Sequence, residues 1–235
     1  MLCKIAELLV EVPVVGDMDS RCTEYICREN KKPDIVVNDS LYRKTAWPGA
    51  DRPMLCYMES GIQFYTHLNR FQGIMLHASA VELDGKAYLF SGPCGMGKST
   101  HTRLWQQVFG PAAQVFNDDK PALRCIDGKW FAYGTPWCGK DGINQNKKVP
   151  LAGICFLKRG ETNVIRQLDT FEAFQKIVSQ TRRKFRDPEI LDLMLINVEN
   201  LISNIPVFEL QNRPEPEAVY LSYQTMHQKA EEMGL

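Results

Sequence analysis

The sequence lacks any apolar run that approaches the roughly 18 residues needed for a membrane-spanning helix. Its start, MLCKIAELLVEVPVV, is apolar, but Glu7 and Glu11 interrupt it and no small-residue cleavage site follows. We therefore expect neither a membrane partner nor a secretory signal.

Patterns built from cysteine and histidine are also missing. The eight cysteines are scattered, without a C-x-x-C pair or histidines at zinc-binding spacing, and the chain has only four histidines. Such a chain has little material for a metal cluster. Free thiols in a reducing cytoplasm fit it better than a disulfide framework, so we expect a cytoplasmic protein.

The chain has no excess of charge of either sign. Lys and Arg together number 28, as do Asp and Glu. A general nucleic-acid or anionic-membrane binder usually carries a basic excess, so both classes are disfavoured. With 235 residues, 44% of them hydrophobic, the chain can bury the core of one large domain with a smaller appendage.

Apolar spacing and turn residues predict a mixture of strands and helices. Residues 1–57 contain short strands, and apolar side chains three and four apart predict a helix over 58–71. Asp84–Gly85 and the DGK at 127–129 lie between β-rich runs and predict two hairpins. The remaining expected elements are a strand before and a helix after the segment 91–99, strands at 113–116, 151–159 and 206–210, and helices at 170–183, 188–204 and 214–230. This mixture predicts an α/β fold with more antiparallel hairpins than a doubly wound sheet has. We divide it into a small β-rich extension with one helix (1–70) and a main domain (71–235).

The segment GPCGMGKS, from Gly92 to Ser99, fits the pattern G-x-x-x-x-G-K-[ST] without a mismatch. Glycines let the backbone curl so that successive N–H groups point at phosphate oxygens, and the following helix adds its N-terminal dipole. Lys98 can reach the β- and γ-phosphates, and the Ser99 hydroxyl can ligate Mg²⁺. The predicted nucleotide-binding residues are Gly92, Pro93, Cys94, Gly95, Met96, Gly97, Lys98, Ser99 and Thr100. The sequence has no N-K-x-D guanine signal, so ATP is the default nucleotide.

Two carboxylates follow the apolar strand in QVFNDDKP. We expect that strand to run beside the one leading into the loop and to bring Asp118 and Asp119 to the phosphates. Because neighbouring side chains on an extended chain point opposite ways, we assign Asp118 to the metal, through water, and Asp119 to accepting a hydroxyl proton. An ordinary Asn-Asp-Asp-Lys-Pro turn is the alternative.

Two histidines lie near this region. If Asp84–Gly85 is a two-residue turn, His77 falls opposite Gly92, where it could contact phosphate or orient an aspartate. A structural role for His77 stays equally open. For His101, on the first turn of the helix, we expect packing or capping.

Two further segments allow more than one interpretation. The segment GTPWCGKDGINQN (134–146) carries Trp137 and Lys140. It is either a loop that holds substrate or a surface turn with an anchoring tryptophan. The basic segment TRRKFR (181–186) is read as a solvated helix end rather than a site for an acidic partner.

Together, LHASAV, GPCGMGKST and NDDKP resemble the catalytic domain of the HPr serine kinase/phosphorylase family, and more closely the small HPr-kinase-related proteins. The resemblance runs from about Phe71 to Leu157 and more weakly to the C-terminus. It implies a P-loop fold shared with phosphoenolpyruvate carboxykinase, with a mixed sheet.

The same resemblance implies roles for individual residues. It implies that Lys98 and Ser99 handle phosphates and Mg²⁺. It also implies that Asp118 and Asp119 are the paired aspartates, one of them the catalytic base. His77 matches the active-site histidine of that family. Where the bifunctional enzymes carry a glutamate-and-arginine signature, this chain reads TPWCGKDGINQN, in which Lys140 could replace the arginine but no glutamate is present. The resemblance therefore leaves phosphorylase activity and HPr as the acceptor open.

These observations predict a Mg²⁺- and ATP-dependent kinase that phosphorylates a hydroxyl, most simply a serine, on a protein, peptide or small molecule. Asp119, Lys98 and His77 are the expected catalytic residues, and Ser99 and Asp118 the metal ligands. Two alternatives stay open: a non-catalytic ATP-binding regulatory module, and a carboxykinase-like phosphotransferase. A homo-oligomer is also left open.

Overall fold

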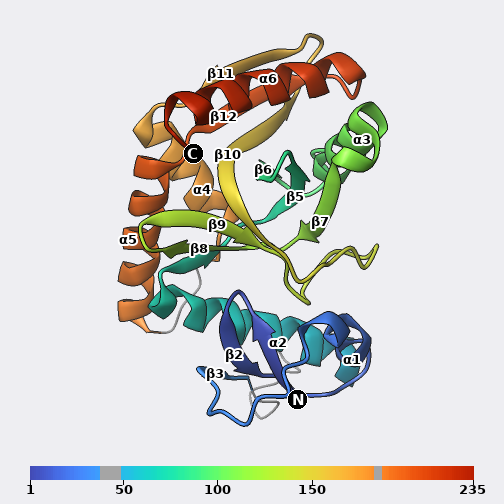
Figure 1. Ribbon diagram of the computed structural model, residues 1–235, viewed down its shortest axis with the longest axis vertical. Coiled ribbons are helices and arrows are strands. Elements are labelled where there is room, and N and C mark those ends of the chain that lie inside the picture. Colours follow the sequence, from blue (N-terminus) through green and yellow to red (C-terminus); the bar gives the residue numbers. More distant parts are fainter. Residues whose placement is uncertain (38–48, 183–186) are drawn as a thin grey trace.

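The computed structural model describes residues 1–37, 49–182 and 187–235. Within these ranges one large mixed sheet and one small sheet form, with helices packed on both faces of the large sheet (Figure 1). Most of the predicted basic helix end at 181–186 lies outside the described residues. No helix in the described part of the chain is both long and apolar enough to cross a membrane.

The large sheet has the strand order β4-β8-β9-β10-β6-β5-β7. Strand β12 pairs with the second half of β10, on the edge opposite β6, and β11 pairs with β12. Its strands are β4 (Gly73–Met75), β5 (Ala78–Leu83), β6 (Lys86–Ser91), β7 (Gln114–Asp119), β8 (Ala122–Ile126), β9 (Lys129–Tyr133), β10 (Lys148–Arg159), β11 (Val164–Gln167) and β12 (Val207–Asn212). Strand β10 pairs antiparallel with β9 through its first residues, then parallel with β6 and β12. The predicted mixed α/β fold with antiparallel hairpins is confirmed.

Both predicted hairpins form around Asp-Gly turns. Asp84 and Gly85 have φ of 52° and 72°, and Asp127 and Gly128 have φ of 49° and 78°. Two positive φ values in succession match the turn that suits the twist of paired strands. In the first hairpin Leu83 pairs with Lys86 and the register continues to Ala78 and Ser91.

The position predicted for β7 is wrong. We expected it beside β6, the strand that leads into the loop, but β5 lies between them. The hairpin return of β5 occupies one edge of β6, and β10 occupies the other by parallel pairing. β7 therefore pairs with β5, antiparallel.

The helices pack on the two faces of the large sheet. They are α3 (Lys98–Phe109), α4 (Thr170–Gln180), α5 (Pro188–Asn204) and α6 (Pro216–Glu232). Alternate residues of β6 explain the two layers: Tyr88 and Phe90 pack with α3 and α6, whereas Ala87 and Leu89 pack with α4 and α5. The loop between β6 and α3 therefore lies at one end of a strand buried on both faces.

The first 68 residues contribute a second layer of structure. A small sheet contains β1 (Leu2–Ile5), β2 (Leu8–Glu11) and β3 (Ile35–Val36). The helix α1 (Met18–Arg21) and the 3₁₀ turn η1 (Thr23–Tyr25) lie between β2 and β3, and α2 (Arg52–Leu68) follows β3. Helix α2 begins earlier than predicted because Pro53 occupies its first turn and Asp51 accepts a hydrogen bond from the Met54 N–H. Figure 1 shows the small sheet and α2 together below the large sheet, and the β1–β2 turn contacts the large sheet directly through Arg124 and Tyr133. Whether residue 70 bounds a domain stays a prediction.

Candidate functional site

The loop between β6 and α3 turns through three glycines with positive φ. Gly92, Gly95 and Gly97 have φ of 145°, 76° and 99°. A Cβ on Gly95 or Gly97 would meet no atom within 4 Å, so backbone conformation rather than crowding requires glycine there. No side chain caps the start of α3, which leaves its first N–H groups directed at the loop.

Lys98 is buried against this loop. Its ammonium donates to the carbonyls of Gly92 (2.9 Å) and Pro93 (3.3 Å), and the residue is 8% exposed. Burial lowers its pKa below the usual value, and the carboxylates of Asp119 and Asp118 offset only part of that shift. Within the described ranges Lys98 forms no ion pair, so a buried cation faces the loop with only carbonyl partners.

The other predicted loop residues differ in exposure. Pro93, Cys94 and Thr100 are exposed, whereas the side chain of Met96 packs at the edge of the core formed with α3 and α6. The side chains of these four residues therefore do not point into the loop as polar ligands would, and nucleotide binding by them stays a prediction.

Ser99 and Asp118 face each other across the loop. The Ser99 hydroxyl lies 3.0 Å and 2.9 Å from the two carboxylate oxygens of Asp118, which is 7% exposed. A hydroxyl and a carboxylate offer hard oxygen ligands of the kind that Mg²⁺ prefers. No group of three or more His, Cys, Asp or Glu within the described chain could hold a metal ion by itself. Mg²⁺ needs only one or two carboxylates when phosphate and water complete its shell, so the pair fits the ion.

Asp119 makes a different set of contacts, as the alternation along the strand predicted. Its Oδ1 lies 2.9 Å from His77 Nε2, and its Oδ2 forms an ion pair with Lys120. Burial alone would raise the pKa of Asp119, but the hydrogen bond from His77 and the charge of Lys120 outweigh it and hold that pKa below its usual range. The backbone of Asp119 has φ of 91°, a strained conformation for a residue with a side chain, and such strain clusters at functional sites.

His77 is held from two sides at the end of β5. Its ring Nδ1 lies 3.3 Å from Gln180 Oε1, and its backbone N–H donates to the Gln180 backbone carbonyl at 2.8 Å. The Ser91 hydroxyl donates to the His77 carbonyl at 2.8 Å, which places His77 next to the start of the loop as the hairpin register predicted. The ring is therefore fixed in orientation toward Asp119.

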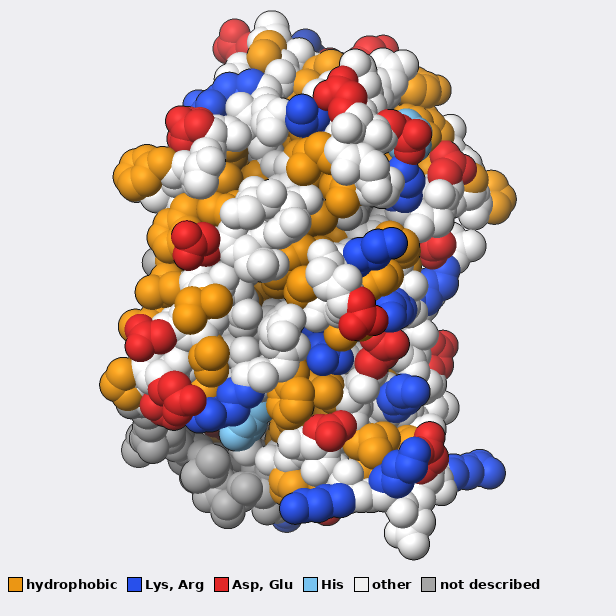
Figure 2. All heavy atoms as spheres, turned by 60° about the vertical axis from the view of Figure 1, so that its left-hand side comes forward, with side chains coloured by type: hydrophobic (Ala, Val, Ile, Leu, Met, Phe, Trp, Pro, Cys, Tyr) orange, Lys and Arg blue, Asp and Glu red, His pale blue; other side chains and the backbone are white. Residues whose placement is uncertain are grey.

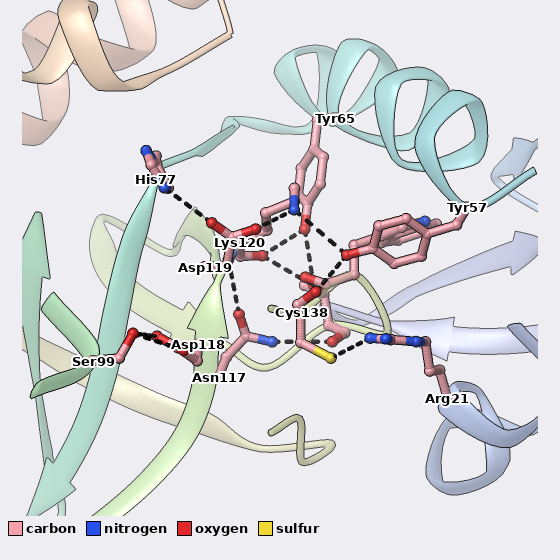
Figure 3. A network of polar contacts seen from close by, with 12 residues as sticks. Arg21, Tyr57, Tyr65, His77, Ser99, Asn117, Asp118, Asp119, Lys120 and Cys138 are labelled. Atoms are coloured by element: carbon pink, nitrogen blue, oxygen red, sulfur yellow. Dashed lines mark hydrogen bonds and ion pairs between the residues drawn. The ribbon is translucent and has the colours of Figure 1, made fainter. Parts of the chain in front are cut away.

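Several residues of this site were not predicted from the sequence (Figure 3). Lys120 pairs with Asp119, and its ammonium lies 3.4 Å from the Tyr57 hydroxyl and 5.5 Å from the centre of the Tyr57 ring. Its carbonyl accepts a hydrogen bond of 2.5 Å from the Tyr65 hydroxyl, and its N–H donates to Asn117 Oδ1 at 3.2 Å. Burial alone would lower the pKa of Lys120, but Tyr57 and Asp119 raise it. Helix α2 thus supports the segment that carries the two aspartates.

The segment 134–146 lies along the outer edge of β7. Gly139 N–H donates to the Asp118 carbonyl at 2.7 Å, Asp118 N–H donates to the Ile143 carbonyl at 3.2 Å, and Asn117 and Asn144 form an isolated bridge. An edge strand has unpaired backbone groups, and this segment satisfies them. It therefore fixes the end of β7 that holds the aspartates.

Trp137 anchors that segment. It is fully buried, its Nε1 donates to the Ser60 hydroxyl at 2.9 Å, and its ring stacks on Phe64 with centroids 4.7 Å apart. This agrees with the interpretation as an anchoring tryptophan. Lys140 is exposed, and a substrate-holding role for the segment stays a prediction.

His101 packs in the core, as expected. It is 1% exposed, and its Nε2 accepts from Trp105 Nε1 at 3.3 Å and lies 3.2 Å from the Ser222 hydroxyl. Burial lowers its pKa to about 3. The neutral ring is part of the packing between α3 and α6.

Comparison with known proteins gives one family and a set of solved structures. The family model described as "SynChlorMet cassette protein ScmC" matches residues 49–213. No curated protein matches the chain. Among solved structures, the HPr(Ser) kinase/phosphatase from Coxiella burnetii is 12% identical over 68% of this chain and 92% of that chain, with a TM-score of 0.40. A likeness this low says nothing about activity, so any proposed activity has to rest on the sheet topology and the geometry of the loop.

Proposed function

We propose that this chain, which belongs to the family of SynChlorMet cassette proteins ScmC, is a Mg²⁺- and ATP-dependent kinase that phosphorylates a hydroxyl group. The acceptor is a serine or similar alcohol on a peptide, protein or small molecule. The observation that carries the proposal is the convergence of three features on one loop. These are a buried cation without a carboxylate partner, a Ser99–Asp118 pair, and a His77–Asp119 pair.

Binding of the triphosphate is supported by the backbone of the loop. Its N–H groups and the uncapped start of α3 offer donors to phosphate oxygens, and Lys98 adds a desolvated positive charge. In a site shielded from water, such fixed donors stabilise the charge that develops on a transferring phosphoryl group. Lys98 would exchange the Gly92 and Pro93 carbonyls for phosphate oxygens.

Ser99 and Asp118 are the residues that would hold Mg²⁺, Asp118 directly or through water. The ion, when bound, neutralises charge on the phosphate oxygens and orients them for in-line transfer. Their mutual hydrogen bond keeps both oxygen ligands together where α3 begins and β7 ends. Asp118 is nearly buried, which limits competition from bulk water.

Asp119 would accept the proton of the acceptor hydroxyl. His77, held by Gln180, keeps the carboxylate oriented by donating from Nε2 to Oδ1. The lowered pKa keeps Asp119 ionised at neutral pH, so it can accept a hydrogen bond from the alcohol. A weak base suffices because phosphoryl transfer passes through a loose transition state, in which the hydroxyl proton moves late.

The test is incubation with labelled ATP and candidate acceptors, followed by mass spectrometry of whatever gains phosphate. Asp119→Asn should keep nucleotide binding and lose transfer by roughly 10²–10⁴-fold, the usual contribution of a general base. Asp141→Asn is the matched control, since Asp141 lies in the 134–146 segment beside β7 and pairs with the exposed Arg103. Unchanged turnover in Asp119→Asn would remove the assigned base. Tight nucleotide binding without a phosphorylated product from any acceptor would instead support the regulatory module.

A further inference from the structure

Arg21 is a half-buried cation without an acidic partner in the described part of the chain. It ends α1, its Nη1 donates to the Sγ of Cys138 at 2.7 Å, and its guanidinium lies 5.0 Å from the centre of the Tyr57 ring. Sulfur is a weak acceptor, and a guanidinium has five N–H donors in a planar fork. Most of the hydrogen-bonding capacity of Arg21 is therefore available to an anion.

Arg21 lies close to the aspartate pair through Cys138 and Gly139. The Cys138 carbonyl accepts a hydrogen bond of 2.5 Å from the Tyr57 hydroxyl. The next residue, Gly139, donates its backbone N–H to the Asp118 carbonyl at 2.7 Å, and a Cβ added to it would lie only 3.6 Å from Asp119 Cβ. Arg21 is thus joined through Cys138 to the segment that contacts the aspartates, and Figure 3 shows Arg21 beside Cys138, with Asp119 on the other side of Cys138.

A second cation, Lys120, lies at the same tyrosine. Both oxygens of Asp119 are engaged, one by His77 and one by Lys120, but each carboxylate oxygen can accept a second hydrogen bond, so an acceptor hydroxyl can bind beside either contact. His77 is fixed by Gln180 on its far side, whereas the Lys120 ammonium is the end of a long, flexible side chain. Lys120 would therefore shift to admit the hydroxyl beside Oδ2, and its ammonium would stay with Arg21 around Tyr57.

We propose that Arg21 and Lys120 form an anion subsite for the acceptor, which carries a carboxylate close to the hydroxyl that is phosphorylated. The inference rests on the proposed function and names its substrate class. The chain has no net charge, and both signs are interspersed over the face in Figure 2, so a preference for an anionic acceptor needs a local pair of cations such as this one. It also assigns a role to the N-terminal segment, which supplies Arg21 from α1 and Tyr57 from α2.

The carboxylate can come from an acidic side chain beside a serine in a peptide or from the α-carboxylate of a free hydroxy amino acid. The probes are therefore the capped peptides Glu-Ser-Glu and Gln-Ser-Gln in one arm, and free serine and serinamide in the other. The wild type should favour the carboxylate-bearing member of at least one pair by about tenfold or more in kcat/KM, the usual scale for one charge-assisted hydrogen bond.

Arg21→Gln should abolish that preference, Arg21→Lys should restore part of it, and Lys31→Gln should leave it unchanged. Lys31 is a matched control because it is an exposed cation of the same N-terminal segment. A binding measurement separates this inference from the proposed function: calorimetry with the unreactive capped peptide Glu-Ala-Glu and with free alanine. Binding of either that weakens about tenfold in Arg21→Gln, with an unchanged melting temperature, supports the subsite even if no transfer occurs. The anion subsite is overturned if the wild type has equal kcat/KM for the charged and neutral members of both pairs, or if Arg21→Gln keeps the wild-type preference.

Discussion

Trp137→Ala tests whether the segment 134–146 is anchored by one buried side chain. Trp137 is fully buried, stacks on Phe64, meets Tyr65 edge-on with centroids 5.6 Å apart, and donates to Ser60. Truncation to alanine removes these contacts and leaves a cavity that a helix and a sheet on either side cannot close. The same change frees Gly139 from its fixed position against Asp118.

The expected loss of unfolding free energy follows from two independent scales. A buried tryptophan removes about 150–250 Å² from water, which at about 25 cal/mol per Å² corresponds to roughly 4–6 kcal/mol. Measured Trp→Ala changes in cores cost about 3–5 kcal/mol. The Ser60 hydroxyl keeps its own donation to the Tyr57 carbonyl at 3.1 Å, so no further penalty for an unsatisfied donor is added. We expect a loss of about 4 kcal/mol and, at 2–4 °C per kcal/mol, a melting temperature lower by roughly 8–16 °C.

Urea unfolding and differential scanning calorimetry measure this loss, and Trp130→Ala is the matched control. Trp130 is also buried, with its Nε1 donating to Asn200, but it belongs to the core on the α5 side. Both variants should be destabilised to a similar degree. Only Trp137→Ala should also weaken Mg²⁺-nucleotide binding. A loss below about 1 kcal/mol, within the range of ordinary surface changes, would refute the anchoring role.

Three further predictions concern stability. A Cβ on Gly134 would lie 1.8 Å from the Gln145 carbonyl oxygen, so Gly134→Ala should displace the 134–146 segment and cost on the order of 2–3 kcal/mol in urea unfolding; a cost near zero would contradict this. Asn117 is fully buried and joins the Thr135 carbonyl to the Lys120 N–H, so Asn117→Ala should cost about 2–4 kcal/mol by the same assay, and a wild-type midpoint would argue against the network. His101 stays neutral when folded, with a pKa of about 3 against 6.5 in the unfolded chain, so below pH 6.5 the unfolded state binds more protons and stability falls toward pH 3. His101→Leu should therefore flatten the stability curve between pH 6.5 and 4, and an unaltered slope would exclude His101 as its source.

Turn chemistry explains which hairpins were predictable. Asp84–Gly85 carries its left-handed conformation in its own residue types, so the register that brings His77 to the loop followed from a local signal. The turn at Ala6–Glu7 has φ of 49° and 63° without glycine or asparagine, and it was not predicted. Its cause is tertiary, since Arg124 donates to the Ala6 carbonyl at 2.6 Å from a distant strand. Strand β11 was missed as well, because it is short and mostly exposed.

In the candidate site, too, some contacts could be predicted from local sequence signals and others could not. The different contacts of Asp118 and Asp119 were predictable from strand alternation alone. Lys120 was not, because neighbouring side chains meet only where Asp119 adopts a left-handed backbone, and because its other partner, Tyr57, comes from α2. The strand order could not be predicted from local signals either, because it depends on which strands occupy the two edges of β6.

The most direct test of the central claim is calorimetric titration of a non-hydrolysable ATP analogue into the wild type and Lys98→Ala, each with Mg²⁺ and with EDTA. The account predicts binding that needs Mg²⁺ in the wild type and falls by about tenfold or more in Lys98→Ala, the scale of one charge-assisted contact. Binding of equal strength in both proteins, or binding indifferent to EDTA, would contradict a Mg²⁺-triphosphate site at this loop.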